Sequence, residues 1–377
     1  MSTIPTFTIR PALQLPRPDR IAWKSLWGYP RSLTSEQALP LASLVERYGL
    51  SLTHSVREMG DAGRSHNWLL ETGSGKKVLK SYKEAVDREQ IIQEHSILAQ
   101  LADRRFPAPR LVAARGGETW VEEQGAHYAL FDYLEGYYQF HKQLFVPNQT
   151  RAFLRTAGAA LASLHQTLRD FEPTGKNPNG FISVEGPRWR GLEWFLGKLK
   201  TSQETNRRQR DNCSDDVHGE LVNRSPWIEE RLAQLEESLQ HAPLTRVIIH
   251  GDYGPYNLLL KPGSPVVILD FELARVDWRL TDLAFSMMTF ARNRLGFQLE
   301  KFRVFLQGYQ ETGAIPPEEL RYLPLVCEYL SLRRAIVCWF RSLGTEQEKW
   351  LSEAIDRLSI VDWIREHQAA VVEVCMS

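Results

Sequence analysis

The residues with the clearest capacity for chemistry follow an apolar run at 247–249, a pattern typical of a buried strand. His250, Gly251 and Asp252 come directly after this run, and Asn257 lies five residues beyond the aspartate. A strand that ends in a carboxylate, with an amide close behind, can deliver both groups to one point. We therefore treat Asp252 and Asn257 as members of one predicted site.

A second apolar run, at 266–269, ends at Asp270. If the two runs form adjacent buried strands, Asp252, Asn257 and Asp270 converge. Oxygen ligands buried together need a cation, and Mg²⁺ prefers oxygen ligands that include phosphate and water. The sequence predicts Asn257 and Asp270 as metal ligands, and it leaves Asp252 as the catalytic residue that orients or deprotonates a substrate hydroxyl.

Between residues 51 and 83, short β-type runs alternate with turn residues. One of these turns contains Gly60 and Gly63, whose backbone N–H groups could approach phosphate oxygens closely. A plain hairpin turn explains the same glycines, so the loop alone does not predict a phosphate site.

Lys80 lies in the last of these β-type runs, and Glu94 lies in a segment of helical period at 87–101. Glu94 falls on the apolar stripe of that predicted helix, where a carboxylate needs a cation. Lys80 is the nearest candidate in the sequence, and Glu89 is the alternative carboxylate. We expect an ion pair between Lys80 and Glu94.

The elements that must position these residues fall into two groups. A short amphipathic helix is predicted first, with its regular part beginning near Pro40 and Gly49 as its stop. Short strands and one helix follow as far as residue 136, and the pattern beyond 150 is mainly helical. The polar stretch 201–220 has almost no apolar period, and we expect an exposed loop or a mobile insertion there.

Composition favours a folded protein with two lobes, because the chain has 377 residues and is 43% hydrophobic. The 46 basic and 46 acidic side chains balance, so neither nucleic acid nor membrane is an expected partner. The N-terminus lacks a signal-peptide apolar region, and no run of about 18 apolar residues occurs, so we expect a cytoplasmic protein. Four scattered cysteines predict reduced thiols.

Three polar residues near these motifs receive structural interpretations. We expect His250 to brace its turn through hydrogen bonds, and His165 to be a hydrogen-bonded structural histidine. Asp282 follows a threonine at the start of an apolar helix, which favours capping or bracing over metal binding.

The His-Gly-Asp motif, the asparagine and the later Asp-Phe-Glu, with a lysine and a glutamate upstream, resemble the aminoglycoside phosphotransferase and choline kinase superfamily. This superfamily is the small-molecule branch of the protein-kinase-like fold. Kinase signatures place a catalytic aspartate five residues before a metal-binding asparagine, with a second metal-binding aspartate downstream. Asp252, Asn257 and Asp270 match that order, and the resemblance extends over roughly residues 41–292.

The resemblance implies a bilobal α+β fold, with an antiparallel N-lobe sheet carrying one main helix and a mainly helical C-lobe. We predict an N-terminal extension at 1–33, a nucleotide-binding N-lobe at 34–135, and a catalytic and substrate-binding C-lobe at 136–377. The helix before the first strand resembles the leading helix of homoserine-kinase-type members.

The resemblance also assigns nucleotide-binding roles. Lys80, held by Glu94, would grip the α- and β-phosphates of ATP. The segment 63–67 resembles the family's glycine loop, which covers the phosphates and ends in an asparagine. The resemblance implies phosphate contacts from Gly63, Ser65 and Asn67. In this sequence an aspartate and an alanine stand where paired glycines are more usual, so the detail of phosphate contact is open.

Residues 128–136 resemble the hinge that hydrogen-bonds adenine through its backbone, near Asp132 and Leu134. Two departures count against a protein kinase. Glu272 stands where protein kinases carry the third-position glycine of their Asp-Phe-Gly motif, and Gly254 stands where serine/threonine kinases carry a lysine. No Ala-Pro-Glu element follows the motif either.

Together with these residues, the resemblance implies an ATP-dependent O-phosphotransferase that uses Mg²⁺. It would transfer the γ-phosphate to a hydroxyl of a small metabolite or antibiotic, of the amino alcohol, aminoglycoside or sugar type. The alternative is a catalytically silent nucleotide-binding or structural member of the same family. The identity of the acceptor, ATP versus GTP preference and the oligomeric state stay open at this point.

Overall fold

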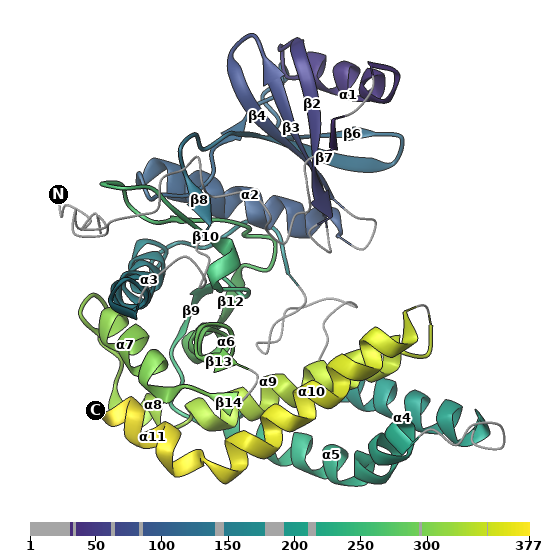
Figure 1. Ribbon diagram of the computed structural model, residues 1–377, viewed down its shortest axis with the longest axis vertical. Coiled ribbons are helices and arrows are strands. Elements are labelled where there is room, and N and C mark those ends of the chain that lie inside the picture. Colours follow the sequence, from purple (N-terminus) through teal and green to yellow (C-terminus); the bar gives the residue numbers. More distant parts are fainter. Residues whose placement is uncertain are drawn as a thin grey trace. The chain divides into compact units, whose positions relative to one another are not determined.

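The computed structural model describes residues 31–32, 35–61, 65–82, 86–139, 147–177, 192–209, 216–293, 296–344 and 346–377. The chain divides into two compact units, and each unit is made of three separate segments of the sequence (Figure 1). Unit 1 comprises Met1–Thr150, Asp170–Lys176 and Tyr256–Glu272; unit 2 comprises Arg151–Arg169, Asn177–Pro255 and Leu273–Ser377. The predicted lobe boundary at 135/136 stays a prediction, and the predicted extension at 1–33 lies outside the described residues except for two positions.

Unit 1 is built on one antiparallel sheet of seven strands, in the order β1-β2-β3-β4-β7-β5 with β6 also paired to β7. Its strands are β1 Arg31–Ser32, β2 Leu52–Asp61, β3 Ser65–Thr72, β4 Gly75–Tyr82, β5 Leu111–Val112, β6 Trp120–Glu123 and β7 Ala126–Asp132. Gly75 has a φ of 103°, which lets the chain turn tightly between β3 and β4. The predicted strands of the N-terminal third are confirmed.

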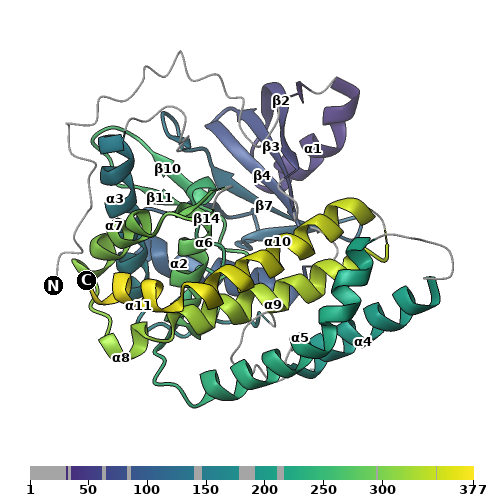
Figure 2. The same ribbon diagram turned by 60° about the horizontal axis from the view of Figure 1, so that its bottom comes forward.

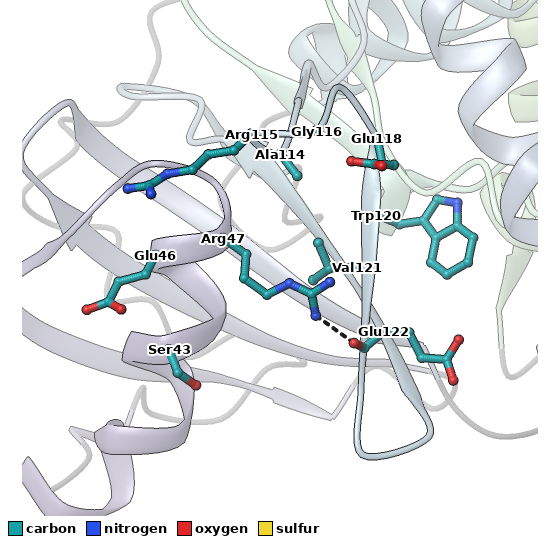
Figure 3. A pocket seen from close by; sticks show the side chains of 10 residues that line it. All are labelled: Ser43, Glu46, Arg47, Ala114, Arg115, Gly116, Glu118, Trp120, Val121 and Glu122. Atoms are coloured by element: carbon teal, nitrogen blue, oxygen red, sulfur yellow. Dashed lines mark hydrogen bonds between the residues drawn. The ribbon is translucent and has the colours of Figure 1, made fainter.

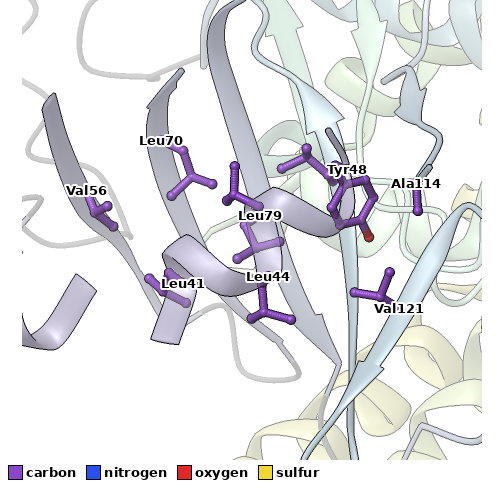
Figure 4. Close-up of a cluster of buried hydrophobic side chains, with 10 residues drawn as sticks. Leu41, Leu44, Tyr48, Val56, Leu70, Leu79, Ala114 and Val121 are labelled. Carbon is purple, nitrogen blue, oxygen red and sulfur yellow. The ribbon is translucent and has the colours of Figure 1, made fainter. Parts of the chain in front are cut away.

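One face of this sheet packs against helix α1, Ser35–Arg47. Leu79 of β4 is fully buried in a hydrophobic cluster with Leu41 and Leu44 of α1 (Figure 4). The expected stop is confirmed, because Gly49 takes a φ of 73° and donates its N–H to the Glu46 carbonyl. The predicted start near Pro40 is wrong: the helix begins at Ser35, and Pro40 lies inside it, where a proline costs an intrahelical hydrogen bond.

The other face of the sheet carries α2, Arg88–Asp103, which begins at a capping box between Asp87 and Gln90. Because side chains alternate along a strand, Lys80 and Tyr82 point to the face opposite Leu79 and meet α2. Unit 1 also contains a three-stranded sheet in the order β11-β10-β8. Its strands are β8 Tyr138–Gln139, β10 Leu258–Leu260 and β11 Val267–Ile268, and the short 3₁₀ helix η3, Pro255–Asn257, precedes β10.

The predicted adjacency of the two apolar runs is wrong. β9, Arg246–Ile249, pairs with β12, Arg275–Trp278, in unit 2, whereas β11 pairs with β10 in unit 1. The short connection between β10 and β11 allows a local antiparallel hairpin, and this pairing takes the edge that β9 was expected to occupy.

Unit 2 is dominated by helices (Figure 2). Besides β9 and β12, its elements are α3 Pro147–Thr167, whose first turn belongs to unit 1, α4 Leu192–Gln209, α5 Asp216–Gln240, α6 Arg279–Phe290, β13 Arg292–Asn293, β14 Gly296–Phe297, α7 Leu299–Gln310, α8 Pro317–Leu320, α9 Leu323–Arg341, α10 Gln347–Glu366 and α11 Gln368–Met376. The helices α9 and α10 run side by side, and α4 packs against both α5 and α9. The C-terminal part is therefore α-rich, as predicted.

The exposed loop predicted at 201–220 is wrong for residues 201–209 and 216–220, which belong to α4 and α5. Leu199 and Ser202 of α4 are fully buried, so the helix makes its contacts with few apolar residues. Tertiary packing has overridden a weak sequence pattern here.

Several chemical expectations can be checked in the described residues. Cys327, Cys338 and Cys375 are free and buried, which agrees with the predicted reduced thiols, and the fourth cysteine, Cys213, lies outside the described residues. No helix within the described ranges is long and apolar enough to cross a bilayer.

Backbone contact between α3 and α7 generates the first prediction. A side chain at Gly158 would overlap the Phe305 carbonyl oxygen, and one at Gly308 would overlap the Arg155 carbonyl oxygen. We expect Gly158→Ala to lower the free energy of unfolding by about 2–3 kcal/mol, because the packed helices cannot separate without loss of contact. Urea unfolding of the purified variant measures this difference.

Gly197→Ala in α4 is the matched control, because no atom lies near the added methyl group. Alanine is the better helix former, so this variant should equal the wild type or gain about 0.5–1 kcal/mol. If both variants have the same stability, the proposed close approach of α3 and α7 is contradicted.

Candidate functional site

The predicted ion pair between Lys80 and Glu94 is present. The Lys80 Nζ lies 3.1 Å from Oε1 of Glu94, and both side chains are buried. Strand β4 supplies the lysine and helix α2 supplies the glutamate, so the pair joins the sheet to the helix that covers it. Glu89, the alternative carboxylate, is exposed.

Two further carboxylates contact the same ammonium group. The Lys80 Nζ lies 3.4 Å from Oδ1 of Asp270 and 3.2 Å from Oε2 of the buried Glu272. Burial alone would lower the pKa of Lys80, but the charges of Glu94, Asp270 and Glu272 hold that pKa well above its ordinary value. Three carboxylates around one ammonium leave the site with an excess of negative charge, an environment that attracts a further cation.

The sequence interpretation missed the contact of Glu272 with Lys80. It treated this glutamate only as a departure from the protein-kinase motif. The available signal was an acidic residue two positions after Asp270, a predicted site residue.

Asp270 and Asn257 are brought together by β10 and β11. The Leu269 N–H donates to the Asn257 carbonyl at 2.8 Å, at the end of the ladder in which Leu258 pairs with Ile268. Asp270 takes a left-handed φ of 61°, a conformation that costs energy in a residue other than glycine and is frequent at functional sites. The Asn257 side chain is buried, whereas the Asp270 side chain is 40% exposed.

These two residues fit a hard divalent cation. An amide oxygen and a partly exposed carboxylate are suitable Mg²⁺ ligands, and water and phosphate normally complete the octahedron. Across the described residues, no group of three or more His, Cys, Asp and Glu side chains could hold a metal ion. A site with two protein ligands, Asn257 and Asp270, stays a prediction from the sequence.

The glycine-loop residues are described only in part. Gly63 lies outside the described residues, and Ser65 is described only by its backbone in β3. Asn67 lies directly opposite Lys80 in the pairing of β3 with β4, so their side chains share one face of the sheet. This register puts Asn67 beside Lys80.

In the segment predicted as the hinge, several backbone groups already have hydrogen-bond partners. The Asp132 N–H donates to the Arg110 carbonyl at 3.0 Å, and the Tyr133 N–H donates to the Lys76 carbonyl at 3.3 Å. The Leu134 carbonyl accepts from the Tyr137 N–H at 3.4 Å. Within the described part of the chain, the Leu134 N–H makes no backbone hydrogen bond and could donate to a ligand.

Asp252 lies in unit 2, after a turn that Asp282 holds. The fully buried Asp282 carboxylate accepts hydrogen bonds from the backbone N–H of His250 at 2.7 Å and of Gly251 at 2.8 Å. It also lies 3.0 Å from Nε2 of His165, whose Nδ1 lies 2.7 Å from the Tyr309 hydroxyl. The bracing role expected for Asp282 and the structural role of His165 are confirmed, and a capping role is not seen.

The turn is tight in two further respects. The Asp252 N–H donates to Nδ1 of His250 at 3.2 Å, as expected for a histidine that braces its own turn. Gly251 has a φ of 81°, and a side chain there would overlap the Leu273 carbonyl oxygen. The backbone before Asp252 is therefore fixed by contacts from several elements of unit 2.

A separate hollow of about 520 Å³ lies in unit 1 beside the C-terminal end of α1 (Figure 3). It is lined by Ser43, Glu46, Arg47, Ala114, Arg115, Gly116, Glu118, Trp120, Val121 and Glu122. Arg47 closes one side by donating to the Glu122 carbonyl at 2.7 Å. Its lining has mixed charge and includes none of the predicted site residues.

The buried position of Asp282 leads to the second prediction. Burial alone would raise the pKa of Asp282, but the hydrogen bonds and charge of His165 and His250 hold that pKa below its ordinary value. Asp282→Asn replaces one acceptor oxygen by a donor that faces backbone N–H groups, so we expect a loss of about 3 kcal/mol in the free energy of unfolding at pH 7. Urea unfolding measures it.

The pH dependence of this loss has a defined sign. The unfolded carboxyl titrates near pH 4 and the folded one lower, so the wild-type advantage over Asp282→Asn is complete above about pH 4 and shrinks below it. The exposed Asp362, paired with Arg224, gives the control: Asp362→Asn should cost at most about 1 kcal/mol. Equal losses in the two variants would contradict the bracing role.

The chain is similar to known phosphotransferases and kinases. A model of the phosphotransferase enzyme family matches residues 57–316. The chain is 25% identical over 295 residues to a homoserine kinase of Caulobacter sp. (strain K31), covering 78% of this chain and 83% of that relative.

Two solved structures show a similar fold. A microcompartment-associated aminopropanol kinase has a TM-score of 0.61 at 17% identity, covering 89% of this chain and 98% of the other. The amicoumacin kinase hAmiN, in complex with AMP-PNP, Ca²⁺ and Ami, has a TM-score of 0.57 at 15% identity, covering 88% and 94%. The predicted kinase-like α+β fold is confirmed.

The class of reaction predicted from the motifs, ATP-dependent phosphoryl transfer to a hydroxyl group, is confirmed at the level of the family. The match covers well over half of the chain and includes the lysine, glutamate, asparagine and both aspartates of the predicted site. The protein belongs to the phosphotransferase enzyme family.

Proposed function

We propose that the protein uses ATP and Mg²⁺ to phosphorylate the hydroxyl group of a small amino alcohol. The observation that carries this proposal is Lys80, buried among Glu94, Asp270 and Glu272 in unit 1. Such an ammonium group is suited to contact phosphate oxygens, and the adjacent Asp270 is suited to bind the cation that accompanies them.

The acceptor class is proposed from the relatives. Homoserine and aminopropanol, which appear in the names of two of the proteins described above, both carry an amine and a hydroxyl group. An antibiotic acceptor has the support of a third relative, the amicoumacin kinase. We favour the small amino alcohol because the homoserine kinase match rests on the higher sequence identity.

The nucleotide would bind to groups of unit 1. Lys80, oriented by Glu94, would contact the α- and β-phosphates, and Gly63, Ser65 and Asn67 would cover them. At the predicted hinge, the Leu134 N–H and the Asp132 carbonyl would recognise the edge of the adenine ring, and the Leu134 N–H makes no backbone hydrogen bond within the described residues.

Asn257 and Asp270 would hold the magnesium ion. When bound, Mg²⁺ neutralises charge on the phosphate oxygens and aligns the γ-phosphoryl group. The hairpin hydrogen bond between Leu269 and Asn257 keeps these two ligands in register, and the left-handed backbone at Asp270 fixes the direction of its side chain.

Asp252 would orient the acceptor hydroxyl and take its proton. The hydroxyl oxygen forms a bond to the γ-phosphorus as the bond between that phosphorus and the bridging oxygen of ADP breaks. Since the transition state of phosphoryl transfer is loose, positioning supplies most of the acceleration, and the proton can leave late. The turn fixed by Asp282 and His250 suits this requirement.

The proposal is tested by ADP release from the purified protein with ATP and Mg²⁺. Separate pools of amino alcohols, sugars, aminoglycosides and nucleosides serve as acceptors, and the product is identified by phosphorus NMR. We expect the amino alcohol pool to stimulate turnover most. Stimulation by another pool alone would reject the acceptor class, and failure to bind ATP would reject the whole assignment.

The third prediction concerns Asp252. Asp252→Asn retains the shape of the side chain but cannot accept a proton, so we expect kcat to fall by about 10²–10⁴-fold while the Kd for ATP changes less than about twofold. Initial-rate kinetics give kcat, and calorimetric titration gives the Kd for ATP. Asp103→Asn, at an exposed position at the end of α2, is the control and should retain full turnover. A kcat close to the wild-type value in Asp252→Asn would contradict the assigned role.

A further inference from the structure

A chain of buried polar side chains continues from Glu94 to residues that the mechanism has not used. Tyr82 lies two positions after Lys80 on β4, and His95 lies next to Glu94 on α2. Thr119 stands just before β6. Tyr82 and His95 therefore come from the two elements that carry the ion pair, and Thr119 comes from the loop that precedes β6.

The contacts form an unbroken series. The Tyr82 hydroxyl lies 2.9 Å from Oε2 of Glu94 and 3.0 Å from Nε2 of His95. Nδ1 of His95 lies 2.7 Å from the Thr119 hydroxyl. Tyr82 and His95 are both buried, at 3% and 5% exposure, and Thr119 is half-buried.

One assignment of protons satisfies every member of this series. Thr119 donates to Nδ1 of His95, the Nε2–H of His95 donates to the Tyr82 oxygen, and the Tyr82 hydroxyl donates to Glu94. This order requires a neutral histidine. Burial, together with the charge of Lys80, lowers the pKa of His95 to about 3, which agrees with that requirement.

The result for Glu94 is that its two carboxylate oxygens have separate partners. Oε1 meets the Lys80 ammonium at 3.1 Å and Oε2 meets the Tyr82 hydroxyl at 2.9 Å. Two contacts on opposite oxygens fix the plane of a carboxylate that one contact would leave free to rotate. The Lys80 Nζ also lies 4.7 Å from the centre of the Tyr82 ring, so one tyrosine restrains both members of the ion pair.

We propose that Tyr82, seated by His95 and Thr119, is a positioning residue that orients Glu94 and thereby holds Lys80 ready for the nucleotide phosphates. This inference rests on the proposed function, in which Lys80 contacts the phosphates. Apolar side chains of the same shape would fill this part of unit 1 equally well. The polar groups instead form a fully paired series that ends on the charged pair, where each hydrogen bond has a directional effect.

The test is Tyr82→Phe, which keeps the ring beneath Lys80 and removes only the hydroxyl group. We expect the Kd for ATP and the KM for ATP to rise about tenfold, because Glu94 loses the donor that holds its plane. The KM for the acceptor and the Kd for adenosine, which lacks phosphates, should stay within about twofold of the wild type. Calorimetric titration and initial-rate kinetics give these four values.

Tyr48→Phe is the matched control. Tyr48 is also buried in unit 1, and its hydroxyl donates to the Tyr128 carbonyl at 2.9 Å on the α1 side of the sheet. This variant loses a comparable hydrogen bond on the face of the sheet opposite Lys80, so its Tm should fall as much as that of Tyr82→Phe while its Kd for ATP is unchanged. Equal ATP affinities in the two variants would overturn the proposal.

A second pair of variants tests the histidine. His95→Gln keeps a side-chain N–H that can donate to the Tyr82 oxygen, whereas His95→Leu removes it. We expect His95→Leu to weaken ATP binding about fivefold and His95→Gln to restore most of the loss. Equal effects of glutamine and leucine would contradict the series. If the wild type fails to bind ATP, the proposed function fails; if it binds ATP and Tyr82→Phe binds it equally well, only this inference fails.

Discussion

The account depends on one constraint, the burial of the Lys80 ammonium group among three carboxylates. A charge removed from water must be paired, and the pairing decides which elements have to meet. Strand β4 must present Lys80 to helix α2, and the β10–β11 hairpin must end beside it with Asp270 and Glu272. Unit 1 meets this requirement with a sheet whose apolar face packs against α1 and whose polar face contacts α2.

The sequence predicts contacts correctly where a charged residue lies within the apolar pattern of a helix. Glu94 on an apolar stripe needed a cation, and the nearest strand lysine supplied it. The bracing role of Asp282 was inferred in the same way, because a carboxylate at the start of an apolar helix has to find donors, and it finds them in the turn before Asp252. In both cases burial limits the possible partners of a polar group to very few.

The sequence was uninformative where the answer depended on pairing or on packing at long range. A short hairpin pairs β11 with β10, whereas β9 pairs with β12, which lies further along the sequence. Helix α4 formed across a polar stretch because its few apolar residues and Ser202 are buried by α5 and α9. The Tyr82–His95–Thr119 series was also hidden, since it joins a strand, a helix and a loop residue that no single period relates.

Membership of the phosphotransferase enzyme family gives the class of reaction, while the acceptor depends on residues that family membership does not specify. The central claim, that Lys80 is the phosphate-binding cation, is tested most directly by calorimetric titration of ATP and of adenosine into the wild type and a folded Lys80→Met variant. The account predicts that Lys80→Met loses at least about tenfold in ATP affinity and binds adenosine as the wild type does. Unchanged ATP affinity, or an equal loss for both ligands, would contradict it.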